Sequence, residues 1–200
     1  LGLSQKYMDG ILSREMPGII PDRYWKEKAI GYGWMHGDTI ISGIGQGFIL
    51  TNCLQLAVMM ARAASNRVVV PRLILTADTP KFETLGLQKK NVDAVLRGLE
   101  QVTRRGGTAA GSAINVNGAR MGGKTGTSQV RSISRAERES GVLTNEQLKW
   151  NMRNHGLFVG YAPTNKPKYV VCAITEHSGG SGLAGRTVAT VMRVLLGDKK

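Results

Sequence analysis

Cysteine is scarce in this chain of 200 residues, which contains only Cys53 and Cys172. The two residues lie far apart and show none of the short Cys or His spacings that hold a metal ion. No metal or cofactor site is therefore expected. Each cysteine lies in an apolar stretch, so two buried free thiols are the simplest interpretation. The sequence does not decide whether they form a disulfide, because nothing in it pairs them.

Long apolar runs are also absent, and the N-terminus shows no signal peptide. A helix that crosses a bilayer needs about 20 consecutive apolar residues, and no stretch of the chain reaches that length. The sequence starts at Leu1 without an initiator methionine. We therefore expect the chain to be a piece of a longer protein.

Acidic residues are few: 14 Asp and Glu stand against 27 Lys and Arg, which gives a formal net charge of +13. Such a charge suggests a nucleic-acid or membrane-surface partner. The basic residues are scattered, however, and no run exceeds two, as at Lys89-Lys90. Zinc-finger spacing, an aromatic RNA-binding signature and a basic zipper are all lacking, so nucleic-acid binding is not expected. The hydrophobic content of 42% is typical of a globular domain with one core.

The stretch from 121 to 129, Met-Gly-Gly-Lys-Thr-Gly-Thr-Ser-Gln, is the most informative part of the chain. Its glycines exclude a stable helix interior, and the alternation that follows them predicts an extended strand. Lys124 supplies a positive charge, while Thr125 and Thr127 fall on the same face of the strand. Gly126 between them lets another chain approach the backbone. The pattern predicts a strand edge that binds the carboxylate end of a peptide.

The N-terminal part of the chain, residues 1–28, is predicted to be irregular. Residues 1–28 carry several turn signals, and Trp25 is expected to anchor them on a core. The Gly-rich residues 43–47 lack both a preceding apolar strand and a following Lys-Ser/Thr. They therefore predict a tight turn between closely packed backbones and not a phosphate site. His36 and Asp38 are interpreted as an ordinary hydrogen-bonded loop pair.

Helical spacing of apolar residues predicts one helix from an N-cap at Thr51 to about Ala64, and a second over 87–103. Several residues of the second helix are expected to face a core: Val92, Val95, Leu96, Leu99 and Val102. Between the two helices, a short strand is predicted over 68–70, with extended chain over 73–76.

The C-terminal part predicts strands over 156–163 and 168–175, joined by a hairpin turn. A helix over 186–196 is expected to bury Val188, Val191, Met192 and Leu195. The polar segment 131–154 is interpreted as an insertion between two strands, with a capping box at Thr144. Together these elements predict an α+β fold in which helices cover an antiparallel sheet.

Seven stretches carry a resemblance that covers nearly the whole chain. They are Pro21-Asp22-Arg23-Tyr24-Trp25-Lys26, Gly37-Asp38-Thr39-Ile40, Gly43-Ile44-Gly45-Gln46-Gly47, Gln55-Leu56-Ala57, Gly107-Thr108-Ala109, Gly123-Lys124-Thr125-Gly126-Thr127, and His155 with Phe158-Val159-Gly160-Tyr161-Ala162-Pro163. In this order they resemble class B penicillin-binding proteins, especially the penicillin-binding protein 2 subfamily. One departure is Asn52-Cys53 after Thr51, where that family usually has Pro. The resemblance implies that residues 1–200 form the C-terminal portion of a transpeptidase domain of the penicillin-binding and β-lactamase-like fold.

The resemblance also implies an activity, peptidoglycan D,D-transpeptidation, in which a serine takes the acyl group of a stem peptide and is acylated by β-lactams. Lys124 would then keep the site positive and support the catalytic hydroxyls. Thr125, Gly126 and Thr127 would bind the carboxylate of the stem peptide or β-lactam, and the Thr127 N–H would help to form an oxyanion hole. By the same resemblance, the parent protein is anchored at the periplasmic face of the inner membrane and works with the glycan polymerase of the elongation machinery.

The nucleophile that this chemistry needs is missing from the sequence. No serine of the chain begins a Ser-x-x-Lys motif, and Ser-x-Asn is absent as well. Acyl transfer requires an activated hydroxyl with a base within hydrogen-bonding reach. The 200 residues alone are therefore predicted to be inactive, as one wall of an active site.

Two alternatives remain at this stage. A β-lactam sensor or β-lactamase relative would share the Lys-Thr-Gly strand, although Gly43-Ile44-Gly45-Gln46-Gly47 before the helix favours the synthase branch. A non-catalytic basic binding module is the second alternative. It would be retained on heparin with an affinity that falls steeply as salt rises.

Overall fold

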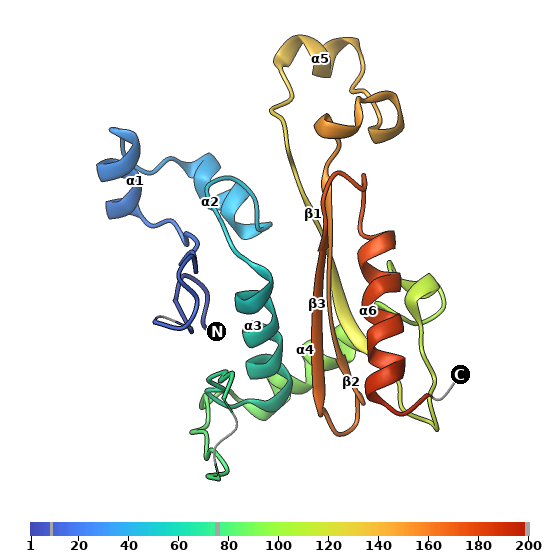
Figure 1. The fold of residues 1–200 in the computed structure, drawn as a ribbon. Helices are drawn as coiled ribbons and strands as arrows, with labels where there is room; N and C mark the ends of the chain where they lie inside the picture. The colour runs from blue at the N-terminus through green and yellow to red at the C-terminus, as the bar shows by residue number, and fades with distance from the viewer. Residues whose placement is uncertain (9, 75–76, 199–200) are drawn as a thin grey trace.

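The structure is a computed structural model that describes residues 1–8, 10–74 and 77–198 (Figure 1). Its centre is an antiparallel sheet of three strands, in the order β1 (Gly122–Ser128), β2 (His155–Ala162) and β3 (Tyr169–Thr175). In the register of the sheet, Lys124 lies opposite Val159 and Val159 lies opposite Cys172. The three predicted strands are confirmed, each within one or two residues at its ends.

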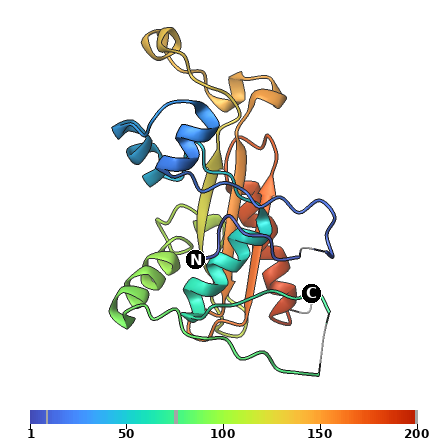
Figure 2. The same cartoon turned by 90° about the vertical axis from the view of Figure 1, so that its left-hand side faces the viewer.

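Helices cover both faces of the sheet, so the predicted α+β class is confirmed (Figures 1 and 2). The long helix α6 (Gly182–Leu195) packs on one face, together with the short 3-10 helix η1 (Ala110–Ser112). The helices α3 (Cys53–Ser65) and α4 (Lys89–Gln101) pack on the other. None of the helices in the described part of the chain has the length and apolar character needed to span a bilayer.

The alternation of side chains along β2 divides the core into two clusters. Phe158 and Ala162 face α6, where they join a cluster that also contains Met121, Ala184, Val188 and Met192. Val159 and Tyr161 face the other way and pack with Met60 of α3. The glycines of β1 make the sheet tight at this point, because a Cβ on Gly123 would lie 2.5 Å from the Phe158 ring. This packing fixes β1 against β2.

The segment between β1 and β2 carries helix α5 (Arg135–Ser140) and the 3-10 helices η2 (Asn145–Gln147) and η3 (Trp150–Met152). It extends beyond one end of the sheet (Figure 1). The predicted capping box is confirmed, since Thr144 and Gln147 bond each other's backbone, but it begins a single 3-10 turn and not a longer helix. The interpretation of 131–154 as an insertion into a larger domain stays a prediction.

The prediction that residues 1–28 are irregular is wrong, because helix α1 (Arg23–Ile30) starts within them. The Asp22 side chain caps this helix by accepting a hydrogen bond from the Trp25 N–H. A second helix that the sequence analysis missed is α2 (His36–Gly43). Its Asp38 does not pair with His36; it forms an ion pair with Lys26, whose side chain is 1% exposed. Lys26, and not Trp25, is thus the most buried side chain of α1.

Other boundaries also need correction. The N-cap of α3 is Asn52 and not Thr51, because the Asn52 side chain accepts from the Gln55 N–H. Residues 68–70 form no strand; an isolated bridge joins Arg67 to Thr84 instead. Residues 73 and 74 form a bend, and the rest of the predicted extended stretch, 75–76, lies outside the described residues.

Two helices turn some predicted core residues towards solvent. In α4, Val95 is 55% exposed, whereas Leu96 and Leu99 pack on the core. Helix α6 starts four residues earlier than predicted, at Gly182, and its Val191 and Leu195 are more than 40% exposed. Val188 and Met192 are buried as predicted, and the other inward positions are filled by small residues close to the sheet, among them Ala184 and Ala189.

Candidate active-site wall

Strand β1 forms an edge of the described sheet, since it pairs with β2 alone. Lys124 and Thr127 are exposed, while Thr125 and Gly126 are half-buried. The Lys124 ammonium donates to the Thr125 carbonyl over 2.9 Å, and the Thr125 hydroxyl lies 3.3 Å from the Thr108 hydroxyl. The four predicted site residues therefore lie together on one accessible strand.

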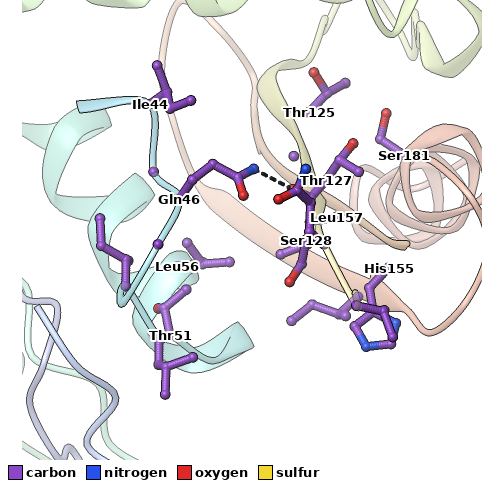
Figure 3. Close-up of a pocket in the computed structure, with 18 of the residues that line it drawn as sticks. Ile44, Gln46, Thr51, Leu56, Thr125, Thr127, Ser128, His155, Leu157 and Ser181 are labelled. Carbon is purple, nitrogen blue, oxygen red and sulfur yellow. Dashed lines mark hydrogen bonds between the residues drawn. The ribbon is translucent and has the colours of Figure 1, made fainter. Parts of the chain in front are cut away.

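The backbone of Thr127 is oriented away from β2. Its carbonyl accepts a hydrogen bond from the Gln46 side-chain amide over 3.3 Å (Figure 3). In an antiparallel strand, the N–H and C=O of one residue point to the same side, and residues two apart share that side. The polar backbone groups of Thr125 and Thr127 consequently face the free edge of β1, where an added peptide strand would pair with them.

A cleft of about 1080 Å³ opens along this edge. One wall is β1 with its continuation to Ser132, and the opposite wall is apolar and comes from the N-terminal half of the chain. The apolar residues on that wall are Leu3, Ile20, Ile44, Ile49, Leu50 and Leu56. Figure 3 shows Gln46 reaching across from this side towards Thr127. The cleft therefore has one polar side and one apolar side.

The turn that carries Gln46 is built by glycine. Gly45 and Gly47 both have positive φ, 74° and 76°, a conformation that other residues adopt at a cost. A Cβ on Gly47 would lie 2.9 Å from the Ile41 side chain, so the turn packs against α2. The predicted tight turn is confirmed, but its close neighbour at Gly47 is a side chain and not another backbone.

The charged side chains that line the cleft are all potential cations: Lys124, Arg131 and His155. Arg131 is already paired, because its guanidinium donates to both oxygens of Glu137 over 2.6 and 2.5 Å. These bonds hold the pKa of Glu137 below its usual value and raise the pKa of Arg131. Lys124 thus remains the charge best placed to attract an anion to the strand.

Two residues of the site were not predicted from the sequence as site residues. Gln46 contributes the contact to Thr127; the sequence placed it between two glycines in one of the stretches that carry the family resemblance, but gave it no role. His155 lines the far end of the cleft, where its Nδ1 accepts from the His177 N–H over 2.9 Å. The His177 ring lies between those of His155 and Trp150, with centroid distances of 4.5 and 4.6 Å. These rings attach the 131–154 segment to the end of β2.

Three serines line the cleft: Ser128, Ser132 and Ser181. None of them is followed by a lysine three residues later, so none has the pattern expected of the nucleophile. No group of three or more metal-binding side chains gathers anywhere in the described residues. The wall therefore combines an exposed strand edge that carries Lys124 with a cleft that has an apolar side.

Comparison with known proteins shows the family of the chain. Residues 1–194 match the family model of the penicillin-binding protein transpeptidase domain, and the chain belongs to this family. Within it, the chain is a region of the class B, penicillin-binding protein 2 type. It is 31% identical to the peptidoglycan D,D-transpeptidase MrdA of Acinetobacter baumannii in an alignment of length 205 that covers 94% of this chain and 29% of that protein.

Solved structures give the same result. Penicillin-binding protein 2 of Helicobacter pylori, in complex with MreC, superposes with a TM-score of 0.79 at 28% identity, over 99% of this chain and 35% of that one. Penicillin-binding protein 2 of Pseudomonas aeruginosa, in complex with WCK 5153, gives a TM-score of 0.77 at 31% identity, over 99% and 42%. The chain spans about 30% of the length of the curated relatives it matches.

Proposed function

We propose that this chain forms one wall of a peptidoglycan D,D-transpeptidase active site and holds the carboxylate end of a stem peptide on β1. The observation that carries the proposal is the free edge of β1, where Lys124 and the outward backbone groups of Thr125 and Thr127 line one cleft. The match to the transpeptidase family over residues 1–194 supports the same reaction class.

Each residue has a role in this proposal. The Lys124 ammonium attracts the carboxylate, and the hydroxyls of Thr125 and Thr127 donate to it. Gly126 has no side chain to keep the peptide from the strand. The Thr127 N–H is one donor of an oxyanion hole, where a preorganised donor acts on the charge that develops in the transition state. β-Lactams carry a carboxylate and a reactive carbonyl, so they would bind in the same way.

The nucleophile is proposed to lie in a part of the longer protein that this chain does not include. The same longer protein would carry the membrane anchor that places the site at the periplasmic face of the inner membrane. Its proposed partners are those of the elongation machinery, including the glycan polymerase. The structure of the Helicobacter pylori relative with MreC supports a partner from that machinery.

The first test is labelling with a fluorescent penicillin. We expect label on a form of the protein extended at its N-terminus to the length of the relatives, and no label on the 200-residue chain, because the acylated serine lies outside it. Label on the chain itself would show that one of its own serines is the nucleophile. Absence of label on both forms would contradict the proposed activity.

Variants of the extended form test the strand. Lys124→Ala and Thr127→Val each remove one charge-assisted hydrogen bond to the carboxylate, so we expect the acylation rate to fall about 10- to 100-fold. Lys90→Ala removes the same charge from the exposed surface of α4 and serves as the control. Equal rates for the Lys124 and Lys90 variants would contradict the role of the strand.

A further inference from the structure

The structure brings together the two cysteines that the sequence left unpaired. Cys53 is the first residue of α3, and Cys172 lies in the middle of β3. Helix α3 packs on β3. Both thiols are free and both residues are partly exposed. Neither cysteine has a role in the proposed transpeptidase site.

The packing of α3 explains why the thiols meet. Cys53, Ala57, Met60 and Ala64 follow the spacing of one helical stripe. Met60 and Ala64 of this stripe pack in the same cluster as Val170 and Cys172 of β3. Because alternate residues of a strand share a face, Ile174 continues this row towards the start of the helix. At the start of this stripe, the Cys53 thiol lies within hydrogen-bonding reach of the Cys172 thiol and of the Ile174 backbone.

We propose that Cys53 and Cys172 form a disulfide that ties the first turn of α3 to β3, by exchange with a disulfide oxidant. A low-molecular-weight disulfide such as oxidised glutathione, or a protein with an exchangeable disulfide, can serve as the oxidant. The periplasm is an oxidising compartment, so the formation of this disulfide in the cell rests on the periplasmic location proposed above.

Cys53 is the attacking thiol. The hydrogen bond from Cys172 lowers the pKa of Cys53, against the opposing effect of burial, and so favours its thiolate. The backbone N–H groups of the first turn of α3 also favour a negative charge there. The same pairing and burial raise the pKa of Cys172. The two thiols therefore share one proton unequally, and Cys53 is the better nucleophile at neutral pH.

The reaction proceeds by two exchanges. The Cys53 thiolate attacks one sulfur of the oxidant, which forms a mixed disulfide and releases the first thiolate of the oxidant. Cys172 then loses its proton and attacks the Cys53 sulfur, which forms the Cys53–Cys172 bond and releases the second thiolate. The two cysteines lose two electrons and two protons in total. The oxidant takes up both electrons and becomes two thiols.

The crosslink lies beside the proposed peptide site. Thr51, Leu56 and Ile174 line the cleft, and they surround the start of α3 and the end of β3. Bonding these two elements fixes the apolar wall relative to the sheet. The disulfide would thus hold the apolar side of the cleft in a fixed position relative to the sheet.

The test uses the intact, folded protein and oxidised glutathione at pH 7.5. After remaining thiols are blocked and the protein is digested without reductant, mass spectrometry should find the Cys53 and Cys172 peptides joined and free of glutathione. Cys172→Ser should stop at the mixed disulfide and retain glutathione on Cys53. In denaturant the joined peptides should form far more slowly, because the two residues then meet only by closing a long loop.

Three results would overturn the proposal: two blocked thiols in the oxidised wild-type protein, stable glutathione on both cysteines, or disulfides only between molecules. The wild-type measurement decides the matter even if the Cys172→Ser variant fails to fold.

Discussion

At the scale of single residues, the ion pair between Lys26 and Asp38 joins the two short helices of the N-terminal segment. The Lys26 side chain is buried and also lies over the Tyr32 ring, with 4.3 Å from Nζ to the ring centroid. Asp38 additionally accepts from the Met35 N–H at the start of α2. A buried lysine without its partner is costly, so Asp38 is needed to keep Lys26 in place.

Asp38 should make the segment sensitive to acid. The hydrogen bond from Lys26, followed by that from the Met35 N–H, lowers the pKa of Asp38 in the folded protein. Its stabilising contribution is then fully present above the unfolded pKa of about 4 and is lost as pH falls through the lower, folded pKa. Asp38→Asn should destabilise the segment at pH 7, and the difference from wild type should shrink below about pH 4.

Urea unfolding monitored by tryptophan fluorescence checks the pH dependence of this destabilisation, because two of the three tryptophans, Trp25 and Trp34, lie in the segment. Asp93→Asn is the matched control, since Asp93 pairs with the largely exposed Lys89 on α4 and such pairs contribute little. A difference between Asp38→Asn and wild type that stays constant from pH 7 to pH 3 would contradict the role given to the Asp38 carboxylate.

At the scale of elements, the start of α3 provides a second test. The Asn52 side chain accepts from the Gln55 N–H over 2.9 Å and also donates to the Met16 carbonyl. Asn52→Ala should therefore cost about 1 kcal/mol of unfolding free energy, the usual effect of removing an N-cap. Thr51→Ala, at the residue that the sequence suggested as the cap, should cost less. Urea unfolding of both variants compares them; a larger loss for Thr51→Ala would favour the original assignment.

The elements that the sequence predicted well are those with long internal patterns. Helices α3, α4 and α6 have 13 or 14 residues, enough for an apolar stripe to repeat several times. Helices α1 and α2 have eight residues each, and α1 depends on a cap at Asp22 and on the distant Asp38. Contacts of this kind cannot be predicted from the local spacing of apolar residues. The predicted strand over 68–70 fails for the converse reason: its residues favour β structure but find no strand to pair with.

The candidate site divides in the same way. Lys124, Thr125, Gly126 and Thr127 could be predicted because they are contiguous and their chemistry depends on one strand. The contact from Gln46 to Thr127 and the meeting of the two cysteines depend on how helices and turns pack on the sheet. The sequence alone contains no short-range pattern for either.

At the scale of the whole molecule, the chain has two parts that are held by different forces. The sheet is stabilised by two apolar clusters, one on each face. The N-terminal 50 residues attach to it largely through polar contacts. Gln55 of α3 is fully buried, and its side-chain amide donates to the carbonyls of Gln5 and Pro17. Ile19 and Leu50 exchange backbone hydrogen bonds beside it.

Parts with less apolar burial open at lower free energy, so the N-terminal segment should exchange its amide hydrogens before the sheet does. Gln55→Ala removes the two partly buried hydrogen bonds to the Gln5 and Pro17 carbonyls, at a cost of roughly 1–3 kcal/mol in total, which corresponds to exchange about 10- to 100-fold faster in residues 1–50. The slowest amides of β2 should change much less, because the apolar clusters around them remain intact. Gln101→Ala, at an exposed position at the end of α4, is the control. Hydrogen exchange with mass spectrometry resolves the two parts. Equal acceleration in both would show that the wall of the cleft and the sheet unfold as one unit, and that the apolar side of the cleft is as rigid as β1.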